Sequence, residues 1–403
     1  MNLSKQSKDL IELFSKNTNY EKQTQKTQKI LKELYNEILD ANNYVKTNIS
    51  FNKSIKKITT ASQIIKPQNF NAKSFPELVR NHINETAMTE ILFSFSLYDR
   101  NVKVYFVVEN DKITSKYDKY VESIAMWLYV LNLYASKECA KTITIYLYFT
   151  SLQKHLPNSN IHILDEINVN TAFTTTCPRE SEIVVFRKEE WFKVFIHETF
   201  HNFGLDFSAM DNSSIKECIL NIYKVNSDVN AYEAYTEFWA EIINALFCSF
   251  HYSSNYNEFL SNSEFYINLE RTYSFFQLNK TLSFMGLNYN DLISNSKHSN
   301  ILRENFYKEN TNVLSYYIIK TVLLNNYQGF LYWCHSNNLT LLDFKKTTGN
   351  VTQFCKFIQK NYKSKLMLEN CIESQELYLL ILKKKNISES VLSNLRMSIC
   401  ELG

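Results

Sequence analysis

Proline and glycine are scarce in this chain of 403 residues, which contains 4 prolines and 5 glycines. No proline follows Pro178. Because proline interrupts helices, its absence from more than half of the chain leaves room for long helical segments. The sequence beyond Pro178 reads as helices joined by Asn- and Ser-rich loops, most clearly at residues 228–250, 313–325 and 351–362.

Close cysteine pairs are absent as well. The eight cysteines are widely scattered, and no CxxC pair occurs among them. A cysteine zinc site or a small disulfide scaffold is therefore not predicted, and reduced thiols in a cytosol-like compartment are expected. The N-terminal sequence MNLSKQSKDL is polar and lacks the apolar core of a signal peptide, so we do not expect secretion.

Long apolar runs and dense basic tracts are missing too. The most apolar stretches, residues 126–135 and 238–250, are short and contain polar residues, so no membrane span is predicted. The formal net charge is only +3, which argues against nucleic-acid binding. With 45% hydrophobic and 21% charged residues, the composition is that of a globular protein with a substantial core.

Strands and a helix alternate in the first half of the chain. The expected elements are a hairpin of residues 92–97 and 102–108, an apolar helix at 116–136, a strand at 143–149, an extended segment at 169–176 and a strand at 183–186. They predict an α+β fold with a mixed sheet. We expect three parts, namely a polar, partly helical N-terminal extension (1–65), an α/β N-terminal lobe (66–210) and a helical C-terminal lobe (211–403).

A buried helix is expected after the last strand. Residues 189–204, EEWFKVFIHETFHNFG, are apolar on most sides of a helix. Glu189 and Glu190 suit its first turn, where the helix dipole favours acidic residues, and Gly204 suits the position after its end. Three polar side chains set into such a helix would be costly to bury, and a metal ion would remove that cost.

Those three side chains form the motif HExxH. His197 and His201 stand four residues apart, so both imidazoles can point at one ion. Glu198 lies beside them and can reach a water on that ion without binding the ion. One further protein ligand would leave a fourth position open, as in catalytic rather than structural zinc sites. A chance occurrence of the motif, or a decayed site, is the competing interpretation.

A second apolar helix contains the candidates for the third ligand. Residues 230–247, NAYEAYTEFWAEIINALF, carry three charges, Glu233, Glu237 and Glu241, spaced four apart in one stripe. Such a stripe can be an ordinary solvated face. Because the flanking positions are apolar and no Lys or Arg offsets the stripe, we favour a metal-binding role.

The two helices together resemble the gluzincins, the thermolysin-like zinc metallopeptidases whose second helix supplies a glutamate ligand. The resemblance covers about residues 140–250 and implies a zincin-like fold. TEFWAE matches with Glu237 as ligand and Glu241 as the acidic residue that supports a metal-bound histidine. The overlapping match EAYTE would make Glu233 the ligand and Glu237 the support. Glu237 is preferred because it is central to the apolar run.

This resemblance implies a zinc-dependent peptidase. Zn²⁺ would polarise the scissile carbonyl and acidify a water, and Glu198 would act as general base. In the family the substrate lies antiparallel to an edge strand of the N-terminal sheet. Ala172, Phe173 and Thr174 occupy the corresponding place, unless the segment is a plain loop.

An oxyanion stabiliser is also expected, usually a tyrosine or histidine of the C-terminal lobe. Tyr316 and Tyr317 are candidates because they follow the ligand helix, although core packing would explain either residue.

A rival ligand scheme comes from Gly204, which also fits HExxHxxG, the start of the metzincin motif. The third ligand would then fall at Phe207, which cannot bind zinc, and Asp206 is one residue early. Met285 could imitate the methionine turn of that family, but a lone methionine is more often a core residue.

The strings HETFHNFGLDFS and YTEFWAE also resemble uncharacterised putative metallopeptidases of large DNA viruses. A cytoplasmic or virion-associated location and a peptide or protein substrate are the corresponding expectations. Two other classes stay open. One is a zincin-fold structural or virion protein that binds zinc without turnover, and the other is a binding module whose aromatic C-terminal lobe docks a partner. The intact Glu198 argues against a decayed enzyme.

Overall fold

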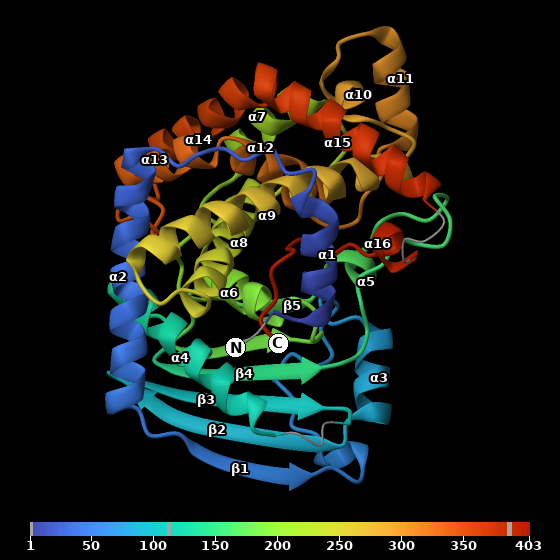
Figure 1. Ribbon diagram of the computed structural model, residues 1–403. Coiled ribbons are helices and arrows are strands. Elements are labelled where there is room, and N and C mark those ends of the chain that lie inside the picture. Colours follow the sequence, from blue (N-terminus) through green and yellow to red (C-terminus); the bar gives the residue numbers. More distant parts are fainter. Residues whose placement is uncertain (1–2, 111–113, 385–388) are drawn as a thin grey trace.

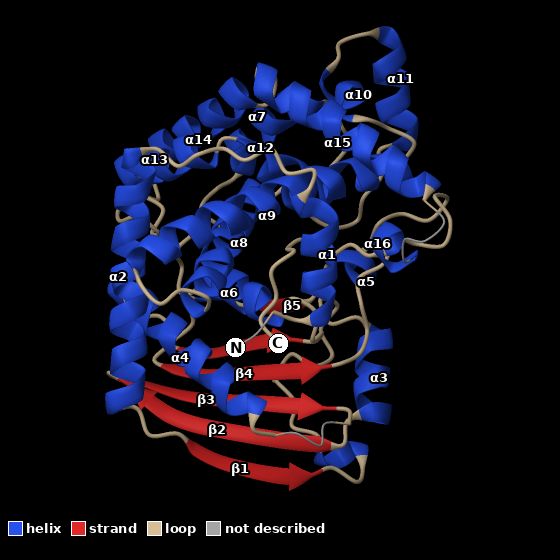
Figure 2. Ribbon diagram, viewed as in Figure 1, coloured by secondary structure: helices blue, strands red, loops and turns tan. Residues whose placement is uncertain are grey.

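The computed structural model describes residues 3–110, 114–384 and 389–403. A six-stranded sheet stands beside a large group of helices (Figure 1). The α+β class predicted from the sequence is therefore confirmed. The strand order is β1-β2-β3-β4-β6-β5, which puts β5 at the edge nearest the central helices (Figure 2).

The sheet is mixed. Strands β1, β2 and β3 are antiparallel neighbours, β3, β4 and β6 are parallel, and β5 is antiparallel to β6. The strands are β1 (Asn52–Lys57), β2 (Thr89–Leu97), β3 (Arg100–Val108), β4 (Thr142–Phe149), β5 (Ala172–Thr174) and β6 (Glu180–Val185). The expected hairpin joins β2 to β3 through Tyr98, whose φ of 52° is left-handed.

The remaining described elements are helices, and none of them is both long and apolar enough to cross a bilayer. They are α1 (Lys5–Ser15), α2 (Gln25–Asn48), η1 (Ala61–Gln63), α3 (Glu77–Thr86), α4 (Lys116–Tyr134), α5 (Glu166–Val169), α6 (Trp191–Asn202), α7 (Ser213–Tyr223), α8 (Ala231–His251), α9 (Tyr256–Phe284), α10 (Tyr289–Ile293), α11 (Lys297–Phe306), η2 (Leu314–Ile319), α12 (Lys320–Asn325), α13 (Tyr327–Asn337), α14 (Thr348–Asn361), α15 (Lys365–Lys383) and α16 (Glu389–Ser393).

The two faces of the sheet pack against different parts of the chain. Side chains alternate between faces along a strand, so neighbouring residues join different cores. Val104 and Phe106 of β3 belong to the main core with α2 and α4, whereas Val107 belongs to a smaller core with α3. The inner strands of the sheet are thus covered on both sides, and the main core continues from them into the helices.

Helices α6 and α8 lie in the middle of the molecule (Figure 1). Every residue of α8 from Glu233 to Ser249 is buried, and the helix packs against α6 on one side and α9 on another. A helix that is apolar on all sides is expected to be surrounded by protein. The two helices that carry the sequence motifs are therefore packed directly against each other.

The sequence predicted that Glu189 and Glu190 form the first turn of the motif helix, and this prediction is wrong. Helix α6 begins at Trp191, and Glu190 precedes it with a left-handed φ of 56°. Both carboxylates are directed to the C-terminal segment instead. Glu189 accepts a hydrogen bond from Asn394 Nδ2 at 2.6 Å, and Glu190 accepts one from the backbone N–H of Met397 at 2.8 Å.

The first 65 residues pack onto the fold. Helix α2 buries Leu31, Leu34 and Ile38 in the main core. Strand β1 pairs with β2 over its whole length, so it completes the sheet. The expected boundary at residue 65 would separate this strand from the sheet to which it is hydrogen-bonded.

Four cysteines form two disulfides, so the expectation of reduced thiols is wrong for these residues. The Cα atoms of Cys139 and Cys177 are 4.6 Å apart, and those of Cys218 and Cys355 are 6.7 Å apart. Both separations are suitable for a disulfide. The other cysteines are free and buried: Cys248, Cys334, Cys371 and Cys400.

Alkylation under denaturing conditions tests these bonds. We expect four cysteines per chain to react without reductant and eight after reduction. In the chain-entropy model, closing loops of 38 and 137 residues stabilises the fold by about 4 and about 5 kcal/mol, so reduction should also lower the unfolding midpoint. Mass spectrometry of the alkylated protein counts the thiols. Eight reactive thiols in the untreated protein would restore the interpretation of a fully reduced chain.

Candidate metal centre

Helix α6 holds the HExxH motif between the sheet and α8. His197 and Glu198 are buried, with 6% and 7% of their surface exposed, and His201 follows one turn later. The helix contacts β5 and β6 on one side and α8 on the other. Gly204 follows its end with a φ of 63°, the left-handed conformation predicted for that position.

Three side-chain atoms converge at this helix. Nε2 of His197 and Nε2 of His201 are 3.1 Å apart. Oε2 of Glu233, from α8, lies 3.1 Å from the first nitrogen and 3.3 Å from the second. Among the residues that the structure describes, these three form the group that could hold a metal ion.

The other nitrogen of each imidazole already has a partner. Nδ1 of His197 lies 2.8 Å from Oε2 of Glu237, and Nδ1 of His201 is hydrogen-bonded to the carboxylate of Asp206. An ionised carboxylate can only accept, so each Nδ1 carries a proton. In the neutral rings, both Nε2 atoms then present lone pairs to each other and to Glu233.

Three acceptors that face one another repel unless positive charge lies between them. In a tetrahedral zinc site with metal–ligand distances of 2.0–2.2 Å, the ligand atoms are about 3.3–3.6 Å apart. The observed separations of 3.1 and 3.3 Å are close to that edge length. Carboxylates on the far side of ligand histidines are also the usual arrangement around a bound metal. The residues therefore fit a metal ion.

The electrostatics of the group favour positive charge at the same point. Burial alone would raise the pKa of Glu233, but His201 and His197 outweigh it, and the pKa falls far below its usual range. Burial alone would lower the pKa of His201, but Asp206 and Glu233 outweigh it, and the pKa rises well above its ordinary value. Protons and a metal ion compete for these donors, since ligands bind a metal in their deprotonated form.

Glu237 and Glu241 do not occupy the places expected for them. Glu237, the preferred ligand, lies on the Nδ1 side of His197, and its Oε1 is 2.5 Å from Nζ of Lys193. Glu241, the expected support of a histidine, instead pairs with Lys320 at 2.6 Å. The structure thus brings Glu233 to the histidines and makes Glu237 the supporting carboxylate. This is the alternative register that the sequence left open.

Glu198 borders a small cavity of ≈ 50 Å³ beside the convergent nitrogens. His197 and Tyr316 also line this cavity. Burial raises the pKa of the Glu198 carboxyl, and His197 and His201 offset part of the rise. A raised pKa suits a carboxylate that must accept a proton and return it near neutral pH.

Tyr316, rather than Tyr317, reaches the site. Its hydroxyl donates to Oε2 of Glu233 at 3.0 Å, and its ring centre is 5.8 Å from that of His197. The hydroxyl of Tyr317 donates to the backbone carbonyl of Leu395 at 2.6 Å. Both residues lie on η2, a π-helix where an α-helix is expected from the sequence. Short π-helical turns are frequent at functional sites.

Part of the expected extended segment 169–176 is an edge strand: β5 covers Ala172–Thr174, whereas Val169 ends helix α5. Strand β5 pairs with β6 and is the last strand in the sheet order. The carbonyl of Thr171 accepts from the N–H of Phe186 at 2.9 Å. Because backbone groups alternate in direction along a strand, those of Ala172 face the open edge. This edge borders the cavity.

The three residues expected to bind substrate do not contribute equally. Ala172 lines the cavity. The ring of Phe173 packs 5.5 Å from that of Phe75 in the smaller core, and the hydroxyl of Thr174 donates to the carbonyl of Glu182 at 2.7 Å. Phe173 and Thr174 therefore hold the strand in place.

The rival ligand scheme finds no support in the geometry. Phe207 packs 4.5 Å from the ring of Phe344. Asp206 reaches Nδ1 of His201, the nitrogen that faces away from the convergent group. Met285 ends α9 as a buried residue. Asp206 was expected only as a possible ligand, and its carboxylate instead orients the ring of His201.

Two residues of the site lie outside the sequence-based prediction. Lys193 stands one turn before His197 on α6, and helical spacing was the signal that could have found it. Met397 reaches the cavity from the C-terminal segment, and no local pattern connects it with the motif.

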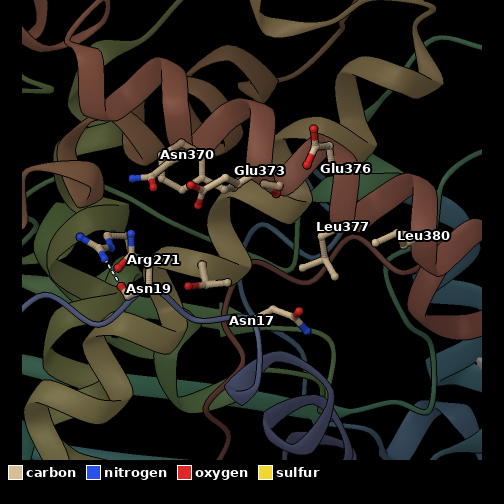
Figure 3. A pocket seen from close by; sticks show the side chains of 11 residues that line it. Asn17, Asn19, Arg271, Asn370, Glu373, Glu376, Leu377 and Leu380 are labelled. Atoms are coloured by element: carbon tan, nitrogen blue, oxygen red, sulfur yellow. Dashed lines mark hydrogen bonds between the residues drawn. The ribbon is translucent and has the colours of Figure 1, made fainter.

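A larger cavity of ≈ 300 Å³ lies elsewhere, among α9, α15 and the chain after α1 (Figure 3). The guanidinium group of Arg271, which lines this cavity, already donates hydrogen bonds to the backbone carbonyl of Asn19 and to the carboxylate of Glu21. Cavity volume alone therefore does not identify the site, whereas the convergent histidines do.

Comparison of the chain with models of protein families, with curated proteins and with solved structures finds no match. The resemblance to the gluzincins therefore stays a prediction, which rests on the two motifs and on the geometry around them.

Metal content tests the assignment of the donors. After dialysis against metal-free buffer, we expect Glu233→Ala and His197→Ala to lose the ion that the wild type retains. Glu237→Gln should bind it about 10- to 100-fold more weakly, as for other residues that orient a ligand. Glu241→Gln is the matched control from the same stripe and should bind like the wild type. Retention by Glu233→Ala together with loss by Glu237→Gln would reverse the assignment.

Proposed function

We propose that the protein is a zinc-dependent peptidase with a zincin-like arrangement of its site. The observation that carries the proposal is the convergence of two imidazole nitrogens and one carboxylate oxygen beside Glu198. The mixed sheet with an antiparallel edge strand next to the HExxH helix supports the zincin-like arrangement. The ligand helix α8, which packs against α6, supports it as well.

Zinc is the proposed metal because of the donor set. Two neutral imidazoles and a carboxylate, with space for a further ligand, are typical of catalytic zinc sites. His197, His201 and Glu233 would hold the ion, and Glu237 and Asp206 would orient the two rings. When bound, the ion supplies a Lewis acid that polarises a carbonyl and lowers the pKa of a water.

Glu198 is the proposed general base. It follows His197 on α6 and lines the same cavity, so its carboxylate can reach a water there without taking part in ligation. It would accept the proton of the attacking water and deliver it to the leaving amine. The burial that raises the pKa of this carboxyl supports a role in which it is protonated for part of the cycle.

Strand β5 is the proposed binding edge for the substrate. The outward-facing backbone groups of Ala172 can pair with an extended peptide, which adds a strand to the sheet. Residues 169–172 border the cavity that contains Glu198, so a peptide on this edge would present its backbone to the base. A peptide or protein substrate is consistent with this geometry.

Tyr316 is the proposed oxyanion stabiliser. Its hydroxyl lies 3.0 Å from Oε2 of Glu233, one of the proposed metal ligands. It can therefore turn to a substrate oxygen that develops negative charge beside that carboxylate.

A second function, zinc binding without turnover in a structural or virion protein, is less well supported. Such a site needs the three donors but no carboxylate at the adjacent cavity. Glu198 is buried there, and among the described residues no protein group hydrogen-bonds to its carboxylate. An unused buried carboxylate would be costly, so its presence favours the enzyme.

Replacement of the base tests the reaction. We expect Glu198→Gln to keep the metal and the fold but to lose peptidase activity by at least about 1,000-fold, since the proton acceptor is gone. A chelator should abolish wild-type activity, and added Zn²⁺ should restore it. Cleavage of a peptide library, followed by mass spectrometry, measures both effects. Equal cleavage by the wild type and Glu198→Gln would exclude the mechanism.

A pair of tyrosine variants tests the oxyanion role. We expect Tyr316→Phe to lower kcat by about 100- to 1,000-fold, the usual cost of removing one oxyanion donor, with little change in KM. Tyr317→Phe is the matched control, because its hydroxyl bonds a backbone carbonyl instead. It should change the stability by about 1 kcal/mol and leave kcat unchanged. Steady-state kinetics separates the two, and equal kcat values would remove Tyr316 from the mechanism.

A further inference from the structure

The C-terminal segment, residues 394–402, runs through the interior. Most of its side chains are buried, and Leu395, Arg396, Ile399 and Cys400 are fully covered. Leu402 forms a β-bridge with Leu3, so the two ends of the chain meet beside the sheet (Figure 1). This segment has no regular periodicity, and tertiary contacts alone hold it in place.

Buried carboxylates hold this segment against the start of α6 and against α9. Oε1 of Glu190 accepts the backbone N–H groups of Met397, at 2.8 Å, and Ser398, at 2.5 Å. Glu270 of α9 accepts the N–H groups of Ile399 and Cys400, each at 2.9 Å. Charge-assisted hydrogen bonds of this kind are about twice as strong as neutral ones. Met397 is therefore held at a fixed place relative to α6.

Met397 lines the cavity that holds Glu198. It comes from the C-terminal segment, whereas residues 169–172 line the cavity from the edge strand. The cavity is small, at ≈ 50 Å³. Met397 is 4% exposed, so its side chain is packed and cannot withdraw into solvent.

The two ammonium groups that line the cavity are already paired. Nζ of Lys154 lies 2.5 Å from Glu190, and Nζ of Lys193 lies 2.5 Å from Glu237. An anionic substrate side chain would find no free partner in these two ammonium groups. Of the described residues that line the cavity, Glu198, the proposed base, is the carboxylate without such a partner, and Val194 and Met397 add apolar walls, so the cavity suits a small uncharged side chain.

We propose that this cavity receives the substrate side chain next to the scissile bond, and that Met397 sets the size limit to small apolar residues. The inference rests on the proposed peptidase function. A peptide that binds antiparallel to β5 has its C-terminal part beside the N-terminal end of β5. Residues 169–171 precede Ala172, so the side chain in the cavity belongs to the residue that follows the scissile bond. The preferred substrates therefore have alanine-sized residues at that position.

Hydroxamates test this without any turnover. The probes are HONH–CO–CH₂–CH(R)–CO–NHCH₃ with R as methyl, isobutyl or benzyl, titrated calorimetrically into the zinc-loaded full chain. We expect the wild type to bind the methyl compound most tightly. Met397→Ala should improve benzyl binding relative to methyl by about 10- to 100-fold, the range for changes of a few methylenes in an apolar pocket. Met397→Val should improve benzyl binding relative to methyl by a smaller factor. It replaces the alanine variant in the test if that variant does not fold.

Met367→Ala is the matched control, since Met367 is a fully buried methionine of α15 away from the cavity. It should leave the ranking of the three probes unchanged. An identical ranking in the wild type and both Met397 variants would overturn the inference and leave the proposed function standing. If none of the probes binds the zinc-loaded wild type, the inference and the proposed metal site fail together. In a peptide library, a shift at the residue before the scissile bond instead would also overturn the assignment.

Discussion

The site depends on two imidazole nitrogens and one carboxylate oxygen held face to face. Nε2 of His197 and Nε2 of His201 are 3.1 Å apart, and each ring is oriented by a carboxylate on Nδ1. Glu233 adds a third acceptor to the same point. This arrangement is unfavourable in a neutral protein interior and favourable around a cation. The surrounding fold therefore has to hold three repelling groups together until an ion or protons arrive.

Packing and paired charges supply that restraint. Helices α6 and α8 are buried on nearly all sides, so neither can rotate to separate the donors. Lys193 bonds Glu237, which fixes the carboxylate that in turn orients His197. A buried ion pair contributes little net stability, but removing one partner leaves an uncompensated charge at a cost of about 3–5 kcal/mol. The pair is better understood as fixing the position of the ring than as stabilising the fold.

The β2–β3 hairpin, strands β4 and β6 and the two motif helices were predicted from local patterns, whereas strand β1 was not, and the contacts between elements were predicted only in part. The i, i+4 spacing predicted the histidine pair, because geometry within one helix determines it. Spacing could not decide among Glu233, Glu237 and Glu241, which share one face of α8. The choice depends on how far α8 is shifted along its axis against α6, and that shift is set by tertiary packing. Met397 and the cysteine pairs were unpredictable for the same reason, since their partners are distant in the sequence and follow no local period.

The stripe on α8 shows why Glu233 is the donor. Glu237 and Glu241 each pair with a buried lysine, Lys193 and Lys320 respectively. Among the described residues, the partners of the Glu233 carboxylate are the two imidazoles, the hydroxyl of Tyr316 and the amide of Asn312. No lysine or arginine in that set balances its charge. A buried carboxylate in that position needs positive charge, which either protons on the two imidazoles or a metal ion bound by all three groups can supply. The buried lysines of α6 and α12 thus pair with two of the three carboxylates and leave the third available to a metal.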